Sequence, residues 1–145
     1  EFGMPVSGAM DHYSLKLANF LVGNKLDAAC IEATVIGPEI LFEDDCFIGI
    51  TGADMNPKLN KEPINSHETI PVKKGDILKL GNTKQGFRAY IAVSGGIDVP
   101  IIMKSRSTYL RGRIGGLCGR QLIPDDILDG MFAQCCNTVI GLLAC

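Results

Sequence analysis

The sequence has no tryptophan, only two histidines and no hydrophobic run near the roughly 20 residues that a membrane-spanning helix needs. The first residues, Glu1 to Pro5, lack the basic region and apolar stretch of a signal peptide. A net charge of −2 also leaves it without the basic excess that is typical of nucleic-acid-binding domains. We therefore expect neither a membrane nor a nucleic acid among its partners.

Cysteines are present, but not in a metal-binding pattern. None of the six forms a C-x-x-C pair, and with only two histidines available a zinc site has little support. Cys30 and Cys46 fall inside apolar runs, where a thiol behaves as a small hydrophobic group. We predict no metal site, and a cytoplasmic protein with reduced thiols.

The 145 residues, 46% of them hydrophobic, are enough for one domain. Glu1-Phe2 resembles a cloning scar, and we exclude it from the fold. The abundance of glycine (17) and proline (7) indicates many turns between short elements.

One helix and a series of strands are predicted. Apolar residues recur at helical spacing over residues 11–22, with Ser7 or Asp11 available as the N-terminal cap and Gly23-Asn24 as the stop. Short β-like runs follow, with the Lys73–Asp76 turn as a candidate hairpin in which Gly75 takes a positive φ. The strands are predicted at Cys30–Ile36, Ile40–Phe42, Cys46–Thr51, Lys58–Leu59, Thr69–Val72, Ile77–Leu80 and Arg88–Val93, with a further strand-and-turn pattern over Gln121–Leu128. This pattern favours a mainly β barrel or sandwich covered by one helix.

Two segments that follow apolar strands are candidate ligand sites. Asp54 ends the run Thr51–Asp54, where its carboxylate is placed to orient a ligand amide or act as a base. The alternative is that it caps its own turn. Ser94-Gly95-Gly96 could aim backbone N–H groups at an anion, although a tight turn with positive φ is the favoured interpretation.

The segment Ser105-Arg106-Ser107-Thr108 is the strongest candidate site. With Arg111 and Arg113 it gathers three guanidinium and three hydroxyl groups within nine residues of a glycine-rich loop. Guanidinium groups bind carboxylates and phosphates through paired hydrogen bonds. A solvated basic loop or a subunit interface is the alternative. Glu32, in an apolar strand, needs solvent or a partner, and an arginine of the 106–113 loop is one candidate.

Several short strings occur in an order that resembles the allophanate hydrolase subunit 2 family, which includes the C subunit of 5-oxoprolinase and an antagonist of a sporulation-kinase inhibitor. The strings are Pro5–Asp11, Ala18-Asn19, Leu21–Asn24, Glu32–Thr34, Thr51–Asp54, Val93–Ile97, Ser105–Tyr109, Gly115-Gly116 and Gly119–Leu122. The resemblance covers about residues 3–129 and implies a cyclophilin-like β-barrel. It also implies an incomplete chain, without an N-terminal β segment and a second half. Residues 130–145 do not resemble the family, and we treat them as a separate tail.

The resemblance implies part of an ATP-dependent 5-oxoprolinase subunit, which would open 5-oxoproline to L-glutamate and be inactive alone. The partners that it implies are proteins like the A and B subunits of that enzyme. In that scheme Asp54 is catalytic and Arg106 holds a carboxylate or phosphate. The other candidate substrate-binding residues are Ser105, Ser107, Thr108, Ser94, Gly95 and Gly96. Two alternatives stay open: a urea-type carboxyltransferase domain that uses biotin, and a regulatory module that relieves inhibition of a histidine kinase.

Overall fold

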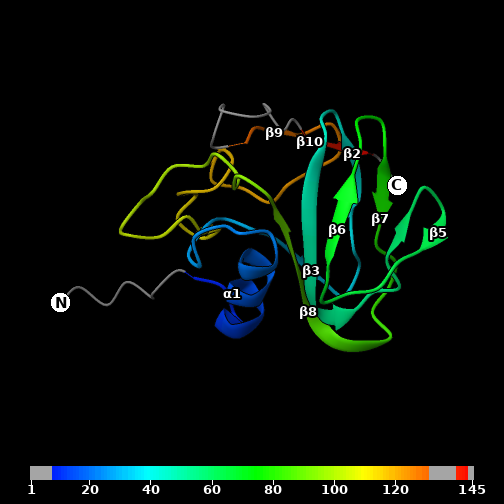
Figure 1. The fold of residues 1–145 in the computed structure, drawn as a ribbon. Helices are drawn as coiled ribbons and strands as arrows, with labels where there is room; N and C mark the ends of the chain where they lie inside the picture. Colours follow the sequence, from blue (N-terminus) through cyan, green and yellow to red (C-terminus); the bar gives the residue numbers. More distant parts are fainter. Residues whose placement is uncertain (1–7, 131–139, 144–145) are drawn as a thin grey trace.

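The computed structural model describes residues 8–130 and 140–143, which form one helix and ten strands (Figure 1). The elements are α1 (His12–Leu21), β1 (Ile31–Thr34), β2 (Glu39–Phe42), β3 (Cys46–Asp54), β4 (Lys58–Leu59), β5 (Glu62–Pro63), β6 (Thr69–Val72), β7 (Ile77–Lys79), β8 (Gln85–Val93), β9 (Ile127–Leu128) and β10 (Ile140–Leu143). The prediction of a mainly β fold with one covering helix is confirmed. The Ser7 cap lies outside the described residues.

The strands form two antiparallel sheets, with the orders β1-β8-β3-β6 and β5-β4-β7-β2-β10-β9. Strands β1 and β6 alternate between buried and outward side chains, as in β6, where Ile70 and Val72 are buried. The main core lies between the sheets and includes Ile40, Phe42, Ile48, Ile50, Leu78, Ile91 and Val93. The described edges of the two sheets do not pair with each other, so the expected closed barrel is instead a pair of packed sheets.

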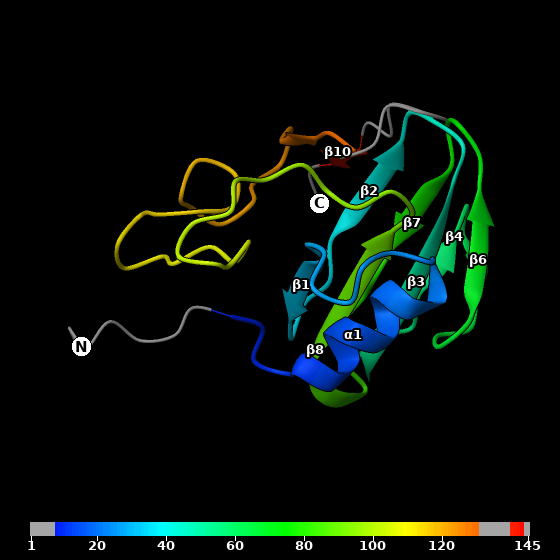
Figure 2. The ribbon, with the colours of Figure 1, turned by 60° about the vertical axis from the view of Figure 1, so that its left-hand side comes forward.

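Helix α1 covers the outer face of β3 and β8 (Figure 2). It begins after Asp11, whose carboxylate accepts hydrogen bonds from the Ser14 backbone N–H (3.0 Å) and hydroxyl (2.5 Å). The predicted cap at Asp11 is therefore confirmed. Ala18 packs against Tyr90 and Ala92 of the sheet in a second, smaller cluster. The side chains of β8 that point away from the main core therefore form the surface on which the apolar face of α1 packs.

Buried polar groups fix the position of this helix. Asn19 is fully buried and donates to the Ala28 carbonyl at 2.8 Å. The Thr51 hydroxyl donates to the Ser14 carbonyl at 2.6 Å. Both bonds satisfy groups that would be costly to bury unpaired.

Three local predictions need correction. The Lys73–Asp76 turn has the expected positive φ at Gly75 (91°), but it joins β6 and β7, which lie in different sheets, so it is no hairpin. Strand β3 continues to Asp54, which the sequence pattern placed after the strand. Strand β8 begins at Gln85, three residues before the predicted start, because its first residues pair with the end of β3 across a register shift.

Residues 99–126 form a long excursion without a strand (Figure 1), and the strand-and-turn pattern predicted over Gln121–Leu128 is a strand only at its end, in β9. Asp126 closes its end. The carboxylate accepts two bonds from the Arg120 guanidinium, at 2.7 and 2.8 Å, and one from the Ile123 N–H at 2.8 Å. The Arg120 bonds, supported by the Ile123 N–H, lower the pKa of Asp126 to about 2.

Replacing Asp126 with asparagine is expected to lower the free energy of unfolding by about 1–2 kcal/mol at pH 7, since it removes the paired contact with a half-exposed arginine. The pKa of Asp126 is lower in the folded chain (about 2) than its ordinary value of 3.8, so its contribution is present above pH 3.8 and is lost as the pH falls toward 2. Urea unfolding at pH 7 and at pH 2 measures both effects. The exposed neighbour Asp125, replaced by asparagine, is the control; an equal loss in both variants contradicts the prediction.

Candidate functional site

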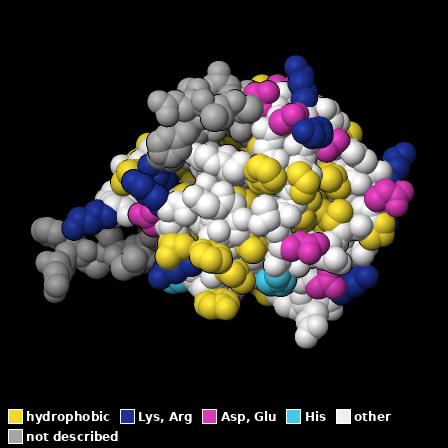
Figure 3. Space-filling view, viewed as in Figure 1, with side chains coloured by type: hydrophobic (Ala, Val, Ile, Leu, Met, Phe, Trp, Pro, Cys, Tyr) yellow, Lys and Arg dark blue, Asp and Glu magenta, His cyan; other side chains and the backbone are white. Residues whose placement is uncertain are grey.

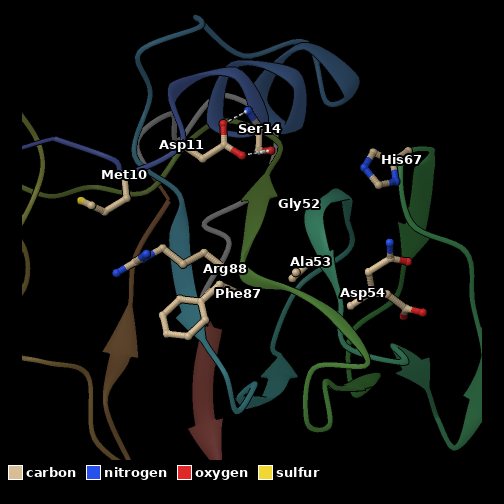
Figure 4. Close-up of a pocket in the computed structure, with 11 residues that line it drawn as sticks. Met10, Asp11, Ser14, Gly52, Ala53, Asp54, His67, Phe87 and Arg88 are labelled. Atoms are coloured by element: carbon tan, nitrogen blue, oxygen red, sulfur yellow. Dashed lines mark hydrogen bonds between the residues drawn. The ribbon is translucent and has the colours of Figure 1, made fainter.

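A hollow of about 680 Å³ lies where the N-terminus of α1 meets the end of β3 and the start of β8. Helix α1 starts at His12 and covers the sheet only as far as Tyr90, so the next outward residues of β8 are left open. The hollow is lined by Met10, Asp11, Ser14, Gly52, Ala53, Asp54, His67, Gln85, Gly86, Phe87 and Arg88 (Figure 4). It is thus a gap between a helix end and a sheet, with polar groups from four segments: the start of α1, the end of β3, the loop before β6 that carries His67, and the start of β8.

Arg88 provides the positive charge of the hollow. In the β1–β8 ladder, Thr34 pairs with Arg88 and Glu32 with Tyr90, which places Glu32 diagonally across from Arg88 on one face. Arg88 Nε lies 3.3 Å from Glu32 Oε1, and the guanidinium carbon lies 5.2 Å from the centre of the Phe87 ring. The expected pairing of Glu32 with an arginine of the 106–113 loop is wrong, because the register of β1 and β8 places Arg88 beside Glu32 and the two form the ion pair.

Glu32 is also the acceptor for a buried tyrosine. Tyr90 is fully buried, and its hydroxyl donates to Glu32 Oε2 at 2.7 Å while accepting from the Asp11 N–H at 3.0 Å. Burial, together with the hydrogen bond to Glu32, raises the pKa of Tyr90 to about 12. Tyr90 therefore stays neutral and ties the start of α1 to the sheet beneath the hollow.

Asp54 and His67 line the hollow at another side (Figure 4). Asp54 Oδ1 accepts from the Asn56 N–H at 2.9 Å, which is the turn-capping role that the sequence left as the alternative. The second carboxylate oxygen makes no hydrogen bond to a described residue. Asp54 thus caps its turn and also lines the hollow, and the two interpretations are compatible.

Ser94, Gly95 and Gly96 lie at the opposite end of the same strands. Ser94 Oγ accepts from the N–H of Phe47, which lies seven residues before Asp54 on β3, about 20 Å at the usual strand rise. The Gly95 N–H donates to Asn24 Oδ1 at 3.0 Å and the Gly96 N–H to the Val93 carbonyl at 3.0 Å. Both N–H groups are engaged within the chain, as in a tight turn.

Ser105, Arg106, Ser107 and Thr108 lie in the 99–126 excursion and do not line the hollow. Arg106 Nη1 donates to the Val99 carbonyl at 2.5 Å, and Ser105 Oγ accepts from the Ser107 N–H at 3.1 Å. Both contacts join residues within the same loop and stabilise its conformation. The structure therefore does not bring Arg106 together with Asp54 in one cavity.

Arg88 was not identified from the sequence as a candidate site residue, because it is the first residue of a segment that has the pattern of a buried strand. The signal available in the sequence was Glu32, a charged residue in an apolar run that requires a partner. Only the pairing of β1 with β8 identifies that partner.

Exposed hydrophobic groups lie on α1. Tyr13 and Phe20 of α1 are 76% and 70% exposed, and Figure 3 shows hydrophobic side chains gathered over this helix. The described residues include no helix long and apolar enough to cross a membrane. Within the same residues, no three His, Cys, Asp or Glu side chains are grouped so as to hold a metal ion.

The family model "Carboxyltransferase domain, subdomain A and B" matches residues 2–135, slightly more than the predicted span of 3–129. The urea amidolyase of Lachancea kluyveri is 47% identical over 128 residues, 88% of this chain and 7% of that protein. The 5-oxoprolinase C subunit of Escherichia coli is 40% identical over 141 residues, 92% of this chain and 46% of that protein.

The crystal structure of the K. lactis urea amidolyase superposes with a TM-score of 0.85 at 42% identity, over 88% of this chain and 8% of that one. The chain thus spans less than half the length of these relatives. These relatives are named as enzymes, a urea amidolyase and a subunit of 5-oxoprolinase.

Proposed function

Because the chain belongs to the carboxyltransferase subdomain A and B family, we propose that it is part of an ATP-dependent 5-oxoprolinase subunit, acting in the cytoplasm. The observation that carries this proposal is the 40% identity to the 5-oxoprolinase C subunit over 92% of the chain. The name of that relative implies further subunits, and we propose partners that resemble the A and B subunits of the same enzyme. The chain alone is expected to be inactive.

The proposed reaction adds water across the lactam C–N bond of 5-oxoproline to give L-glutamate, while ATP is hydrolysed to ADP and phosphate. Asp54 is the proposed catalytic residue, because it lines the hollow and its second oxygen makes no hydrogen bond within the described residues, so that it can hold a water or a lactam N–H. Its position at a strand end fixes the carboxylate through the bond from Asn56.

We do not assign ATP to Ser94-Gly95-Gly96, because both glycine N–H groups already have acceptors and do not form an open phosphate cradle. The Ser105–Thr108 segment stays a proposed contact for a carboxylate or phosphate presented by a partner subunit. Arg106 uses one nitrogen to bind Val99 and leaves the rest of its guanidinium available.

Transfer of a carboxyl group from biotin to urea is the second candidate. The 47% identity to urea amidolyase and the carboxyltransferase description of the family favour it. Urea and 5-oxoproline share a carbonyl bonded to an N–H group, and Asp54 could orient either. In this case biotin would be supplied by another part of the complex.

The test replaces the matching segment of the E. coli C subunit with this chain and co-expresses the hybrid with its partner subunits. ATP-dependent glutamate release from 5-oxoproline is expected, and an Asp54→Asn hybrid should release glutamate at least about 100-fold more slowly. Asp27→Asn, an exposed residue away from the hollow, is the matched control. A complex that assembles but carboxylates urea and leaves 5-oxoproline intact overturns the oxoprolinase proposal in favour of the second candidate.

A further inference from the structure

Arg88 is held in place on one side and open on the other. Its Nε is buried 3.3 Å from Glu32 Oε1, outside hydrogen-bond geometry, and has no hydrogen-bond partner. The Phe87 ring lies 5.2 Å from the guanidinium carbon, a distance at which a cation is attracted to an aromatic face. The ion pair and the ring together fix the plane of the guanidinium.

The two terminal nitrogens of Arg88 make no hydrogen bond to any residue that the structure describes. These nitrogens form the fork that matches the two oxygens of a carboxylate. Glu32 does not occupy this fork, because its other oxygen accepts from Tyr90 at 2.7 Å and from the Met10 N–H at 3.4 Å. Arg88 is thus oriented by one carboxylate and retains the capacity to bind another.

The remaining charges confine an anion to one end of the hollow. Asp11 and Asp54 also line it, but both oxygens of Asp11 accept bonds from Ser14. The Arg88 side chain extends toward Met10 and away from Asp54 (Figure 4). Repulsion by Asp54 is therefore weakest where the guanidinium ends, and solvent screens it further.

The surroundings of this end are apolar. Met10 is 70% exposed and Phe87 is 58% exposed, and both line the hollow beside Arg88. A ligand with a charged oxygen pair and an aliphatic body fits such a surface, because the body covers Phe87 and Met10 while the oxygens meet the guanidinium.

We propose that Arg88 binds the carboxylate of a small, partly aliphatic substrate at the Met10 end of the hollow and so selects anionic substrates over neutral amides. The choice of 5-oxoproline as that substrate rests on the proposed function. Its ring methylenes would lie on Phe87, and its carboxylate on the terminal nitrogens. Arg88 would bind the carboxylate of the substrate, and Asp54 would act on its lactam group.

The test is titration of this chain, followed by nuclear magnetic resonance, with four probes: 5-oxoproline, cyclopentanecarboxylate, the neutral lactam pyrrolidinone, and inorganic phosphate. Arg88→Gln should weaken the binding of 5-oxoproline and cyclopentanecarboxylate by about 10- to 100-fold. It should leave the affinity for pyrrolidinone unchanged. Arg88→Lys, which keeps the charge but not the fork, should recover part of the affinity. Arg111→Gln, an exposed arginine outside the hollow, is the charge-matched control.

The four probes separate the two proposals. Arg88-dependent binding of cyclopentanecarboxylate without preference for 5-oxoproline supports the anion site and counts against the oxoprolinase assignment. Binding of 5-oxoproline that is the same in wild type, Arg88→Gln and Arg111→Gln overturns the role of Arg88 and leaves the proposed function standing. Phosphate binding as tightly as the carboxylates through Arg88 overturns the assignment to a carboxylate. Unchanged thermal unfolding of Arg88→Lys shows that the fold is intact.

Discussion

Replacing Gly49 with valine is expected to lower the free energy of unfolding by about 3 kcal/mol or more, because it separates α1 from the sheet. A Cβ at Gly49 would lie 2.9 Å from the Ala18 carbonyl oxygen and 3.1 Å from Leu21 Cβ. Neither atom is the free end of a flexible side chain, so the helix itself must move. The buried bonds from Asn19 to Ala28 and from Thr51 to Ser14 would be strained with it.

Urea unfolding followed by circular dichroism measures this loss. Gly81→Ala is the control, because the nearest atom to its added Cβ is the Met55 carbonyl oxygen at 3.6 Å, an ordinary contact. Gly49→Ala should fall between the two. If Gly49→Val stays within about 1 kcal/mol of the wild type, the close seating of α1 on β3 is contradicted.

The local elements could be predicted from the sequence because their causes are local. Asp11 and Ser14 mark the start of α1, and alternation in Thr69–Val72 marks a strand with one buried face. The place of Gly49 could not be predicted, because its requirement for glycine comes from a helix about thirty residues earlier in the chain. The prediction of a hairpin at Lys73–Asp76 was wrong for the same reason, because a turn motif does not show to which sheet each flanking strand belongs.

The candidate site shows the same division between local and long-range information. Asp54 was found because a carboxylate at a strand end is visible in the sequence, and the structure places it in the hollow. Arg88 was not found, because its importance arises from the pairing of Glu32 with Tyr90 across two strands nearly sixty residues apart. The glycine and arginine motifs drew attention to the 94–113 region, where much of the hydrogen bonding serves the turns and loop themselves.

Removing the hydroxyl of Tyr90 tests the network beneath the hollow. Tyr90→Phe is expected to lower the free energy of unfolding by about 2 kcal/mol at pH 8, because Glu32 Oε2 loses its shorter hydrogen bond and the Asp11 N–H loses its acceptor. Tyr13→Phe, in which the altered side chain is 76% exposed, should change it by less than about 0.5 kcal/mol. Urea unfolding of the three proteins measures the difference.

The pH dependence of that difference gives a second, independent check. The pKa of Tyr90 is raised from 10.0 to about 12 in the folded chain, so the folded state favours the neutral phenol. Its contribution is therefore complete below pH 10 and is lost as the pH rises from 10 to 12. The advantage of the wild type over Tyr90→Phe should shrink across this window, while Tyr13→Phe should follow the wild type. A difference that stays constant from pH 9 to pH 12 would show that Tyr90 ionises as readily in the folded chain as in the unfolded one, and that Glu32 does not hold it neutral.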